Sequence, residues 1–258
     1  MMISSYLQGG LGNQLFQIAA AISTGIDNNT APAFNVENHH LPNQGRECHN
    51  YLETIFRNLY FSSSLPIKNL YQEPYFHHTP IEYVPDMCLV GYFQSEKYFE
   101  KNGDVIRELF AIDEKTKASI NEKYGELLKN ETVAVHVRRG DYLKYSHMHP
   151  PCELDYYKQA MDNFSKDATY LFFSDDIGWC KENFIHENYI FIEGNEDILD
   201  FYLISECKNV ILSNSSFSWW GAWLNEGGKN LIIAPKKWFG PESIHDTKDL
   251  IPARWKVI

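Results

Sequence analysis

The stretch VAVHVRRGDY, residues Val133–Tyr142, decides the fold of the second half of this chain. Its apolar, β-branched beginning predicts a buried strand, and the Arg-Arg-Gly that follows lies where that strand ends. An Arg guanidinium stays charged and offers a planar fork of donors that matches phosphate oxygens. The stretch is therefore either a grip for an anionic ligand or an ion pair on a surface loop.

Further strands alternate with helices after this stretch. Residues between the strands place apolar side chains three and four positions apart, as Tyr157, Ala160 and Met161 do, which is typical of amphipathic helices. Strands that alternate with helices predict a parallel sheet wound by right-handed crossovers. We therefore expect a Rossmann-like domain over residues 129–240, with strands at Thr132–Val137, Thr169–Phe173, Tyr189–Ile192, Asn209–Leu212 and Asn230–Ala234.

The first half begins with the same pattern. A short strand, Ile3–Leu7, leads through a glycine-rich turn into a helix, Gln14–Thr24, that Gly25 is expected to end. Residues 28–80 are rich in Asn, His and Pro and predict loops with short helices. Order returns with an expected strand at Cys88–Phe93 and helices at Glu96–Phe110 and Glu114–Leu128.

Two α/β lobes with a cleft between them are the simplest architecture for this order of elements. We expect an N-terminal lobe over residues 1–128 and a C-terminal lobe over residues 129–240. The tail, residues 241–258, is expected to return to the N-terminal lobe.

Composition narrows the class of protein. The formal net charge is −11, which argues against nucleic acid as a partner because such binding needs a basic surface. The five cysteines never form a Cys-x-x-Cys pair and predict reduced thiols of a cytoplasmic protein. No apolar run approaches the roughly 18 residues of a membrane span, although peripheral membrane contact stays open. His39-His40, His77-His78 and His147 with His149 lack partners at ligand spacing, so no metal site is expected.

Polar residues follow three of the predicted strands. Because ligands of open parallel sheets bind beyond the carboxyl ends of the strands, these residues are expected to lie near one another. Each alone is an ordinary turn or helix cap, but together they predict a nucleotide site. Arginines would hold phosphates, and carboxylates would hold ribose hydroxyls and base N–H groups. The residues are His136, Arg138, Arg139, Asp175, Asp176, Asn214, Ser215 and Ser216.

A helix begins near Ser215, and its free N–H groups and dipole suit a diphosphate. The three tryptophans of the same helix, Trp219, Trp220 and Trp223, are expected to pack in the core. Asp200, on the preceding helix, is a candidate for accepting hydrogen bonds from a guanine edge, with a solvated helix face as the alternative.

Three motifs that are typical of nucleotide-binding proteins are incomplete or absent in this chain. Gly10, Gly12, Asn13 and Gln14 follow a strand, but the third glycine of the dinucleotide fingerprint is absent. The chain also lacks the Gly-Lys-Ser/Thr of a phosphate-binding loop and any Asp-x-Asp. Without a metal-binding acidic motif, Arg138 is expected to neutralise the phosphate charge. The turn can still close over a phosphate or a sugar.

With these residues assembled, the chain resembles glycosyltransferase family 11, the α-1,2-fucosyltransferases, and specifically its bacterial members. The likeness covers most of the chain, up to Pro235–Phe239. Residues 28–85 are short and unpatterned for the family, so the acceptor is the least defined part. Four segments in order carry the resemblance: Gly9–Gln17, Gly91–Gln94, His136–Tyr142 and Asn214–Leu224.

The resemblance implies a GT-B-type architecture of two Rossmann-like lobes whose parallel sheets face across a cleft. It also implies metal-independent, inverting transfer from GDP-L-fucose to the 2-hydroxyl of a galactose-containing glycan. Arg138 would be the catalytic residue at the donor β-phosphate, and Ser215, Ser216 and Phe217 would bind the diphosphate. Arg139 and Asp141 are alternatively braces of the loop.

Two other functions stay open at this point. One is transfer of another GDP-sugar, or transfer to a hydroxyl that is not on galactose. The other is nucleotide-sugar binding without catalysis. No general base is singled out, because four side chains follow the arginine loop: His147, His149, Glu153 and Asp155.

Overall fold

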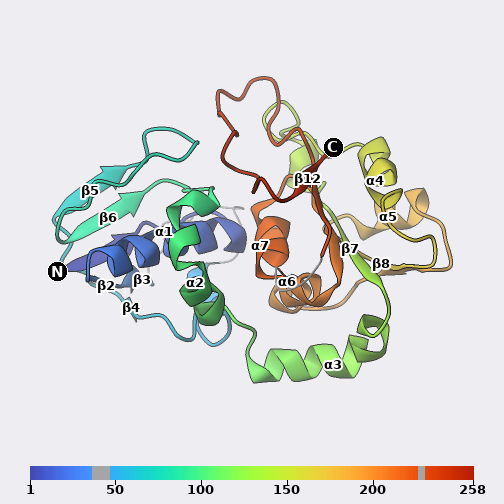
Figure 1. Cartoon of the computed structure of the whole chain (residues 1–258), viewed down its shortest axis with the longest axis horizontal. Coiled ribbons are helices and arrows are strands. Elements are labelled where there is room, and N and C mark those ends of the chain that lie inside the picture. The colour runs from blue at the N-terminus through green and yellow to red at the C-terminus, as the bar shows by residue number, and fades with distance from the viewer. Residues whose placement is uncertain (37–46, 226–229) are drawn as a thin grey trace. The chain divides into compact units, whose positions relative to one another are not determined.

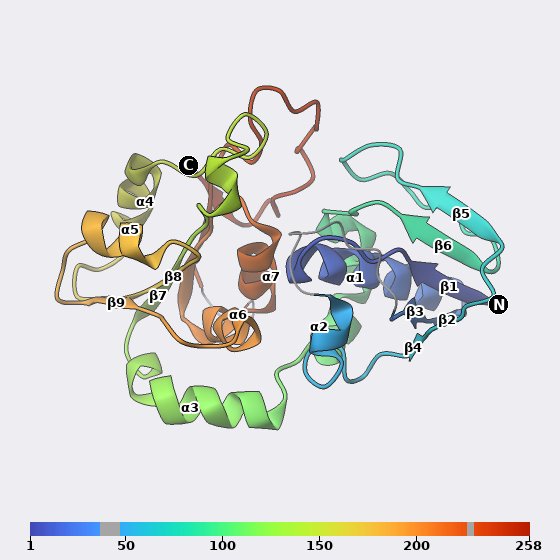
Figure 2. The same cartoon turned by 180° about the vertical axis from the view of Figure 1, so that it is seen from behind.

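The computed structural model describes residues 1–36, 47–225 and 230–258 (Figures 1 and 2). Contacts divide the chain into two compact units. Unit 1 comprises Met1–Ile112 and His245–Pro252, and unit 2 comprises Asp113–Ile244 and Ala253–Ile258. Each unit has its own parallel sheet.

Unit 2 is built on a six-stranded sheet with the order β12-β11-β10-β7-β8-β9, in which every pair is parallel. The central strand, β7, is buried at every position because it is apolar throughout except for Thr132 and His136. The strands are β7 (Thr132–Val137), β8 (Thr169–Ser174), β9 (Tyr189–Phe191), β10 (Asn209–Ile211), β11 (Ile232–Ala234) and β12 (Lys256–Val257).

Helices cover both faces of this sheet (Figure 1). Alternate residues of β7, Val133, Val135 and Val137, pack in one core with α4 (Leu154–Met161) and α5 (Ile177–Asn183). His136 points to the opposite face, where its ring lies 5.6 Å from that of Phe217 in α7 (Ser216–Leu224). On that side α7 packs on α6 (Asp197–Glu206), and α6 packs on α3 (Glu114–Leu128).

The α6–α7 contact is close, since a Cβ on Gly221 would lie 2.8 Å from Ile204 Cγ2. Trp219, Trp220 and Trp223 of α7 are buried in the core, as predicted.

Unit 1 is built on a four-stranded parallel sheet with the order β2-β1-β6-β5 and on one long helix, α1 (Leu11–Asp27). Strands β3 and β4 form a separate parallel pair. The remaining elements are β1 (Met2–Ser5), β2 (Ala31–Pro32), β3 (Phe34–Asn35), β4 (Phe61–Ser62), β5 (Asn69–Gln72), β6 (Met87–Val90), α2 (Gly103–Leu109) and the 3-10 turns η1 (Cys48–Tyr51), η2 (Glu96–Tyr98) and η3 (Glu100–Asn102).

Some expected elements differ from the structure. Helix α1 continues through Gly25 instead of ending there. The glycine at this position serves packing, because a Cβ would lie only 2.6 Å from the carbonyl oxygen of Thr30. The predicted helix Glu96–Phe110 is two 3-10 turns followed by α2, since the Ser95 side chain caps a first short turn. Residues 28–80 contain short strands in addition to loops.

The contacts also group residues differently from the predicted lobes. Helix α3 lies in unit 2 rather than in the N-terminal lobe, because Lys123 and Tyr124 hydrogen-bond to Asn195 at 3.2 and 2.8 Å. The predicted tail is split between the units. His245–Pro252 belongs to unit 1, and β12 adds the last strand to the sheet of unit 2.

Candidate functional site

Arg138 lies directly after β7, where two carboxylates hold its guanidinium. Nη2 donates to Asp141 Oδ1 at 2.5 Å, and Nη1 lies 2.9 Å from Asp175 Oδ2. The side chain is 35% exposed, so it lies at the surface of the strand end while both contacts fix its orientation. A guanidinium has further N–H donors beyond these two, which gives Arg138 the means to bind an anion.

Arg139 is held by a different set of contacts. Its Nε donates to Asp176 Oδ2 at 3.1 Å, its backbone N–H donates to Asp175 Oδ1 at 2.9 Å, and its guanidinium lies 4.0 Å above the Trp179 ring. Only 17% of the side chain is exposed. Arg139 is thus packed into the strand-end loops.

The two aspartates that follow β8 have structural tasks in this arrangement. Asp176 Oδ1 accepts the N–H of Trp179 at 3.2 Å and caps α5. Asp175 binds both arginines, and a Cβ on Gly140 would lie 2.4 Å from its Oδ2, so a larger residue there would displace the carboxylate. The cluster of Arg138, Arg139 and three aspartates carries one more negative than positive charge. An anionic ligand therefore needs donors from Arg138 and from elsewhere.

His136 is the second polar residue of the strand end. Its Nδ1 lies 2.7 Å from Ser213 Oγ, which joins the ends of β7 and β10. Burial, with the nearby charge of Arg138 as the second cause, lowers the pKa of His136 to about 3. The ring is therefore neutral near pH 7 and acts as a hydrogen-bonding group rather than a cation.

The arginine loop is tied to the segment before α7. Tyr142 donates from its hydroxyl to the carbonyl of Asn214 at 3.1 Å. The Asn214 amide in turn donates to the carbonyls of Pro150 and Trp238, both at 2.9 Å, so this predicted ligand residue holds three loops together. The backbone of Gly240 also packs closely against this loop, since a Cβ on Gly240 would lie 2.0 Å from the carbonyl oxygen of His147.

The N-terminus of α7 follows directly. Ser215 is the residue before the helix, and its side chain makes no capping bond. The first N–H groups of a helix without such a cap are donors for an anion, and the helix dipole adds to the attraction. Ser215, Ser216 and Phe217 follow Asn214, which Tyr142 of the arginine loop contacts, and their role toward a diphosphate stays a prediction.

Asp200 occupies a more distant position on α6. Its Oδ1 accepts the side-chain N–H of Asn195 at 2.8 Å. Burial raises the pKa of the Asp200 carboxyl, and the hydrogen bond from Asn195 partly opposes that rise. No contact of the described residues joins Asp200 directly to Arg138, and its role toward a base stays a prediction.

In unit 1 the glycine-rich turn is held by buried glutamines. Gln14 donates to the carbonyl of Gly9 at 2.9 Å, and Gln17 donates to the carbonyl of Gly91 at 3.1 Å. Gln94 donates to Asn13 Oδ1 at 2.8 Å. Gly10 precedes α1 without a side-chain cap, and Gly12 is buried in the first turn. The four segments that carry the resemblance thus meet in pairs, two within each unit.

Sequence reasoning missed Glu73, which lies just after β5. Its carboxylate accepts the N–H of Tyr92 at 2.7 Å and that of Phe93 at 3.0 Å. Burial raises the pKa of Glu73, and both N–H bonds oppose that rise. Phe93 is buried and has a φ of 53°, a conformation that is unusual for a bulky residue and indicates a constrained loop. A carboxylate in an unpatterned segment gave no signal in the sequence.

The candidates for a general base have different surroundings. The His149 ring stacks on Tyr142 with a centroid distance of 5.1 Å and packs against Phe239, whereas Glu153 precedes α4. No base is assigned.

The described residues bear on membrane and metal binding. None of their helices combines the length and the apolarity that a membrane-spanning helix would need. Within the same ranges, no three His, Cys, Asp or Glu side chains are grouped so that they could hold a metal ion. His39-His40 lie outside the described residues.

Comparisons with known proteins bear on both units. A sequence model described as Glycosyl transferase family 11 matches residues 62–258. An α-1,2-colitosyltransferase of Escherichia coli is 30% identical, and the alignment covers 98% of this chain and 98% of the relative. Galactoside α-(1,2)-fucosyltransferase 2 of Hylobates lar is 29% identical, with 88% of this chain and 69% of the relative covered.

Among solved structures, the fucosyltransferase NodZ from Bradyrhizobium superposes with a TM-score of 0.57 at 13% identity. The match covers 86% of this chain and 92% of that chain. At that identity the likeness concerns the fold alone. The predicted α/β fold of GT-B type, with a parallel sheet in each of two units, is confirmed.

Proposed function

The chain belongs to glycosyl transferase family 11 and is a glycosyltransferase, and on this premise we propose that it transfers L-fucose from GDP-β-L-fucose to the 2-hydroxyl of a galactoside. The observation that carries the proposal is the oriented guanidinium of Arg138 at the end of β7. Beside it, joined through Tyr142 and Asn214, lies the N-terminus of α7, which Ser215 precedes without a side-chain capping bond. The family match and the fucosyltransferase relative support the choice of a GDP-sugar and a glycan.

The chemistry follows from inversion. The acceptor oxygen approaches the anomeric carbon on the face opposite GDP, through a transition state with oxocarbenium character. Negative charge then builds on the β-phosphate that leaves. Arg138 and the first N–H groups of α7 are fixed before the reaction, so they stabilise that charge more in the transition state than in the ground state.

We propose that no metal ion is needed for this step, because Arg138 and the α7 N-terminus supply the positive charge. Asp175 and Asp141 would keep Arg138 in place, and Arg139 and Asp176 would brace the loop. Asp200 is our candidate for the guanine. The five cysteines are free thiols, which supports a reducing compartment such as the cytoplasm.

A second donor has a specific observation in its favour. The colitosyltransferase relative covers nearly the whole chain at 30% identity. Colitose is the 3-deoxy analogue of L-fucose, so the same phosphate-binding residues would serve GDP-fucose and GDP-colitose. A site that hydrogen-bonds the 3-hydroxyl of fucose would reject colitose, and a site without such a partner would accept both.

One assay separates these donors. The protein is incubated with lactose and with GDP-fucose, GDP-colitose or GDP-mannose in turn, and GDP release is measured. The proposal expects the highest kcat/KM with GDP-fucose, and NMR of the product should show an α-1,2 linkage to galactose. A higher kcat/KM with GDP-colitose, or a linkage at another hydroxyl, would contradict the proposal.

A further inference from the structure

Residues 75–79 of unit 1 form a partly exposed segment, rich in aromatic rings, that the donor chemistry does not use. Tyr75 is 62% exposed, and its ring stacks on that of His77 with a centroid distance of 5.1 Å and an interplanar angle of 4°. Phe76 turns to the other side and stacks on His245 at 4.8 Å. Of this parallel pair, Tyr75 is the exposed ring, and the His77 side chain is 24% exposed.

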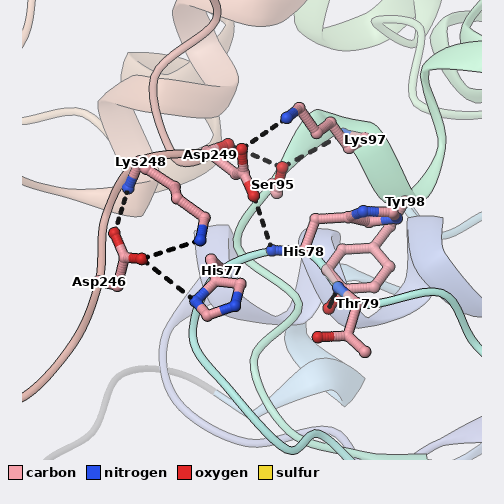
Figure 3. Close-up of polar contacts among 9 residues, drawn as sticks. All are labelled: His77, His78, Thr79, Ser95, Lys97, Tyr98, Asp246, Lys248 and Asp249. Carbon is pink, nitrogen blue, oxygen red and sulfur yellow. Dashed lines mark hydrogen bonds and ion pairs between the residues drawn. The ribbon is translucent and has the colours of Figure 1, made fainter.

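Hydrogen bonds hold the segment at both ends, and those at its second end are drawn in Figure 3. Before it, Glu73 binds the backbone of Tyr92 and Phe93. After it, the N–H of His78 donates to Asp249 Oδ2 at 3.2 Å, and the N–H of Thr79 donates to the Tyr98 hydroxyl at 3.1 Å. A surface loop held so tightly loses little freedom when it binds a ligand.

Asp249 is the residue that fastens this region to the C-terminal segment. Besides His78, its carboxylate accepts from Lys97 Nζ at 2.5 Å, and its carbonyl accepts from Ser95 Oγ at 2.7 Å (Figure 3). Burial alone would raise the pKa of Asp249, but the bond and charge of Lys97 lower it. Ser95 directly follows Gln94, which binds Asn13. The glycine-rich turn and residues 75–79 therefore share one support.

Charged groups flank the rings. Asp246 Oδ2 lies 3.4 Å from His77 Nδ1 and 3.0 Å from Lys248 Nζ, and its side chain is 48% exposed (Figure 3). The segment also follows β5, and so lies at the carboxyl edge of the sheet, where open parallel sheets bind ligands. An aromatic face beside a carboxylate and an ammonium suits a sugar, which has an apolar face and hydroxyl groups around it.

We propose that the stacked rings of Tyr75 and His77, with Asp246 beside them, bind a sugar ring of the galactoside acceptor, and that Asp249 is a positioning residue for this site. The proposal rests on the proposed function for the identity of the acceptor. It assigns acceptor recognition to unit 1, with the two rings in the region, residues 28–85, that is unpatterned for the family and the two aspartates near the end of the chain.

Kinetics of single variants test the site with GDP-fucose and lactose. Tyr75→Ala should raise the KM for lactose by about tenfold, because a stacking face is lost, and leave the KM for GDP-fucose unchanged. Tyr75→Phe keeps the ring and should behave as the wild type. Tyr60→Ala is the matched control, since Tyr60 is 64% exposed in the same unit and lies outside the proposed site. An unchanged lactose KM in Tyr75→Ala, or an equal rise for both substrates, would overturn the proposal.

Asp249 needs a readout that a general loss of stability would not produce. Asp249→Asn should raise the KM for lactose and not that for GDP-fucose, and Asp249→Glu should recover part of the loss. A parallel loss for both substrates would contradict a positioning role.

A binding measurement separates this inference from the proposed function. Saturation transfer from the protein to lactose is recorded by NMR for the wild type and for Tyr75→Ala. Lactose signals that weaken in Tyr75→Ala support the site even where no transfer from GDP-fucose occurs, in which case the proposed reaction alone fails. Equal signals in both proteins would refute the site.

Discussion

Arg138 and Asp175 are joined directly, with Nη1 2.9 Å from Oδ2, while the other oxygen of the same carboxylate accepts the backbone N–H of Arg139 at 2.9 Å. Asp175 thus fixes both the end of β7 and the direction of the guanidinium. In the proposed reaction this contact prepares Arg138 for the leaving diphosphate before the substrate binds.

Gly140→Ala tests that preparation. The new Cβ would lie 2.4 Å from Asp175 Oδ2, so the carboxylate must move and Arg138 with it. We expect kcat/KM for GDP-fucose to fall by about 10- to 100-fold, the cost of a small misplacement of a reacting group. Gly178→Ala in α5 is the control, since nothing lies within 4 Å of its Cβ. Wild-type kinetics in Gly140→Ala would mean that this contact does not set the rate.

The buried His136 predicts how stability depends on pH. Its pKa is about 3 in the folded protein and about 6.5 in an unfolded chain. As pH falls through this window the unfolded chain takes up a proton that the folded protein does not, so stability falls. Between pH 7 and pH 5 the loss from this residue is about 2 kcal/mol.

Urea unfolding at both pH values checks this prediction. His136→Gln should lose less stability than the wild type over the same interval, whatever its stability at pH 7. The same change in both proteins would show that His136 titrates normally.

Several features of the fold followed directly from the sequence, for physical reasons. Strand Thr132–Val137 and helix Glu114–Leu128 are observed at the predicted bounds. The first is buried at every position and mainly apolar, and in the second Asp113 caps the first turn. The adjacency of the polar strand ends also followed, because β10, β7 and β8 are neighbours in a parallel sheet.

Other features depend on contacts between residues far apart in the chain. Gly25 lies within a helix where a local rule predicts the end of the helix, and its glycine serves packing instead, since a Cβ would lie 3.1 Å from Ile3 Cγ2. Asp249 gathers Ser95, Lys97 and His78 from more than 150 residues away, and nothing near Asp249 in the sequence indicates those partners. The charge balance around Arg138 likewise became visible only once Asp175 was placed.

Glu73 makes a prediction about unit 1. Glu73→Ala leaves the N–H groups of Tyr92 and Phe93 without their acceptor, so the free energy of unfolding should fall by about 2 to 3 kcal/mol. Glu73→Gln keeps one carbonyl oxygen and should lose less. Glu82→Ala, at an exposed position of the same connection, should change it by less than about 0.5 kcal/mol. Denaturant unfolding compares the three, and equal values for Glu73→Ala and Glu82→Ala would refute the role of Glu73.

The proposed charge balance predicts how the enzyme responds to removal of metal ions. Turnover of GDP-fucose and lactose should be the same with and without EDTA, because Arg138 and the α7 N-terminus neutralise the diphosphate. A loss of turnover in EDTA that Mg²⁺ restores would contradict the metal-independent mechanism.

The central claim is that Arg138 stabilises the departing GDP, and the turnover of Arg138→Ala with GDP-fucose and lactose tests it most directly. With circular dichroism establishing that the variant is folded, we expect kcat to fall by about 10²-fold or more. Arg138→Lys should fail as well, because it keeps the charge and loses the planar fork. A folded Arg138→Ala protein that turns over at nearly the wild-type rate would contradict the account.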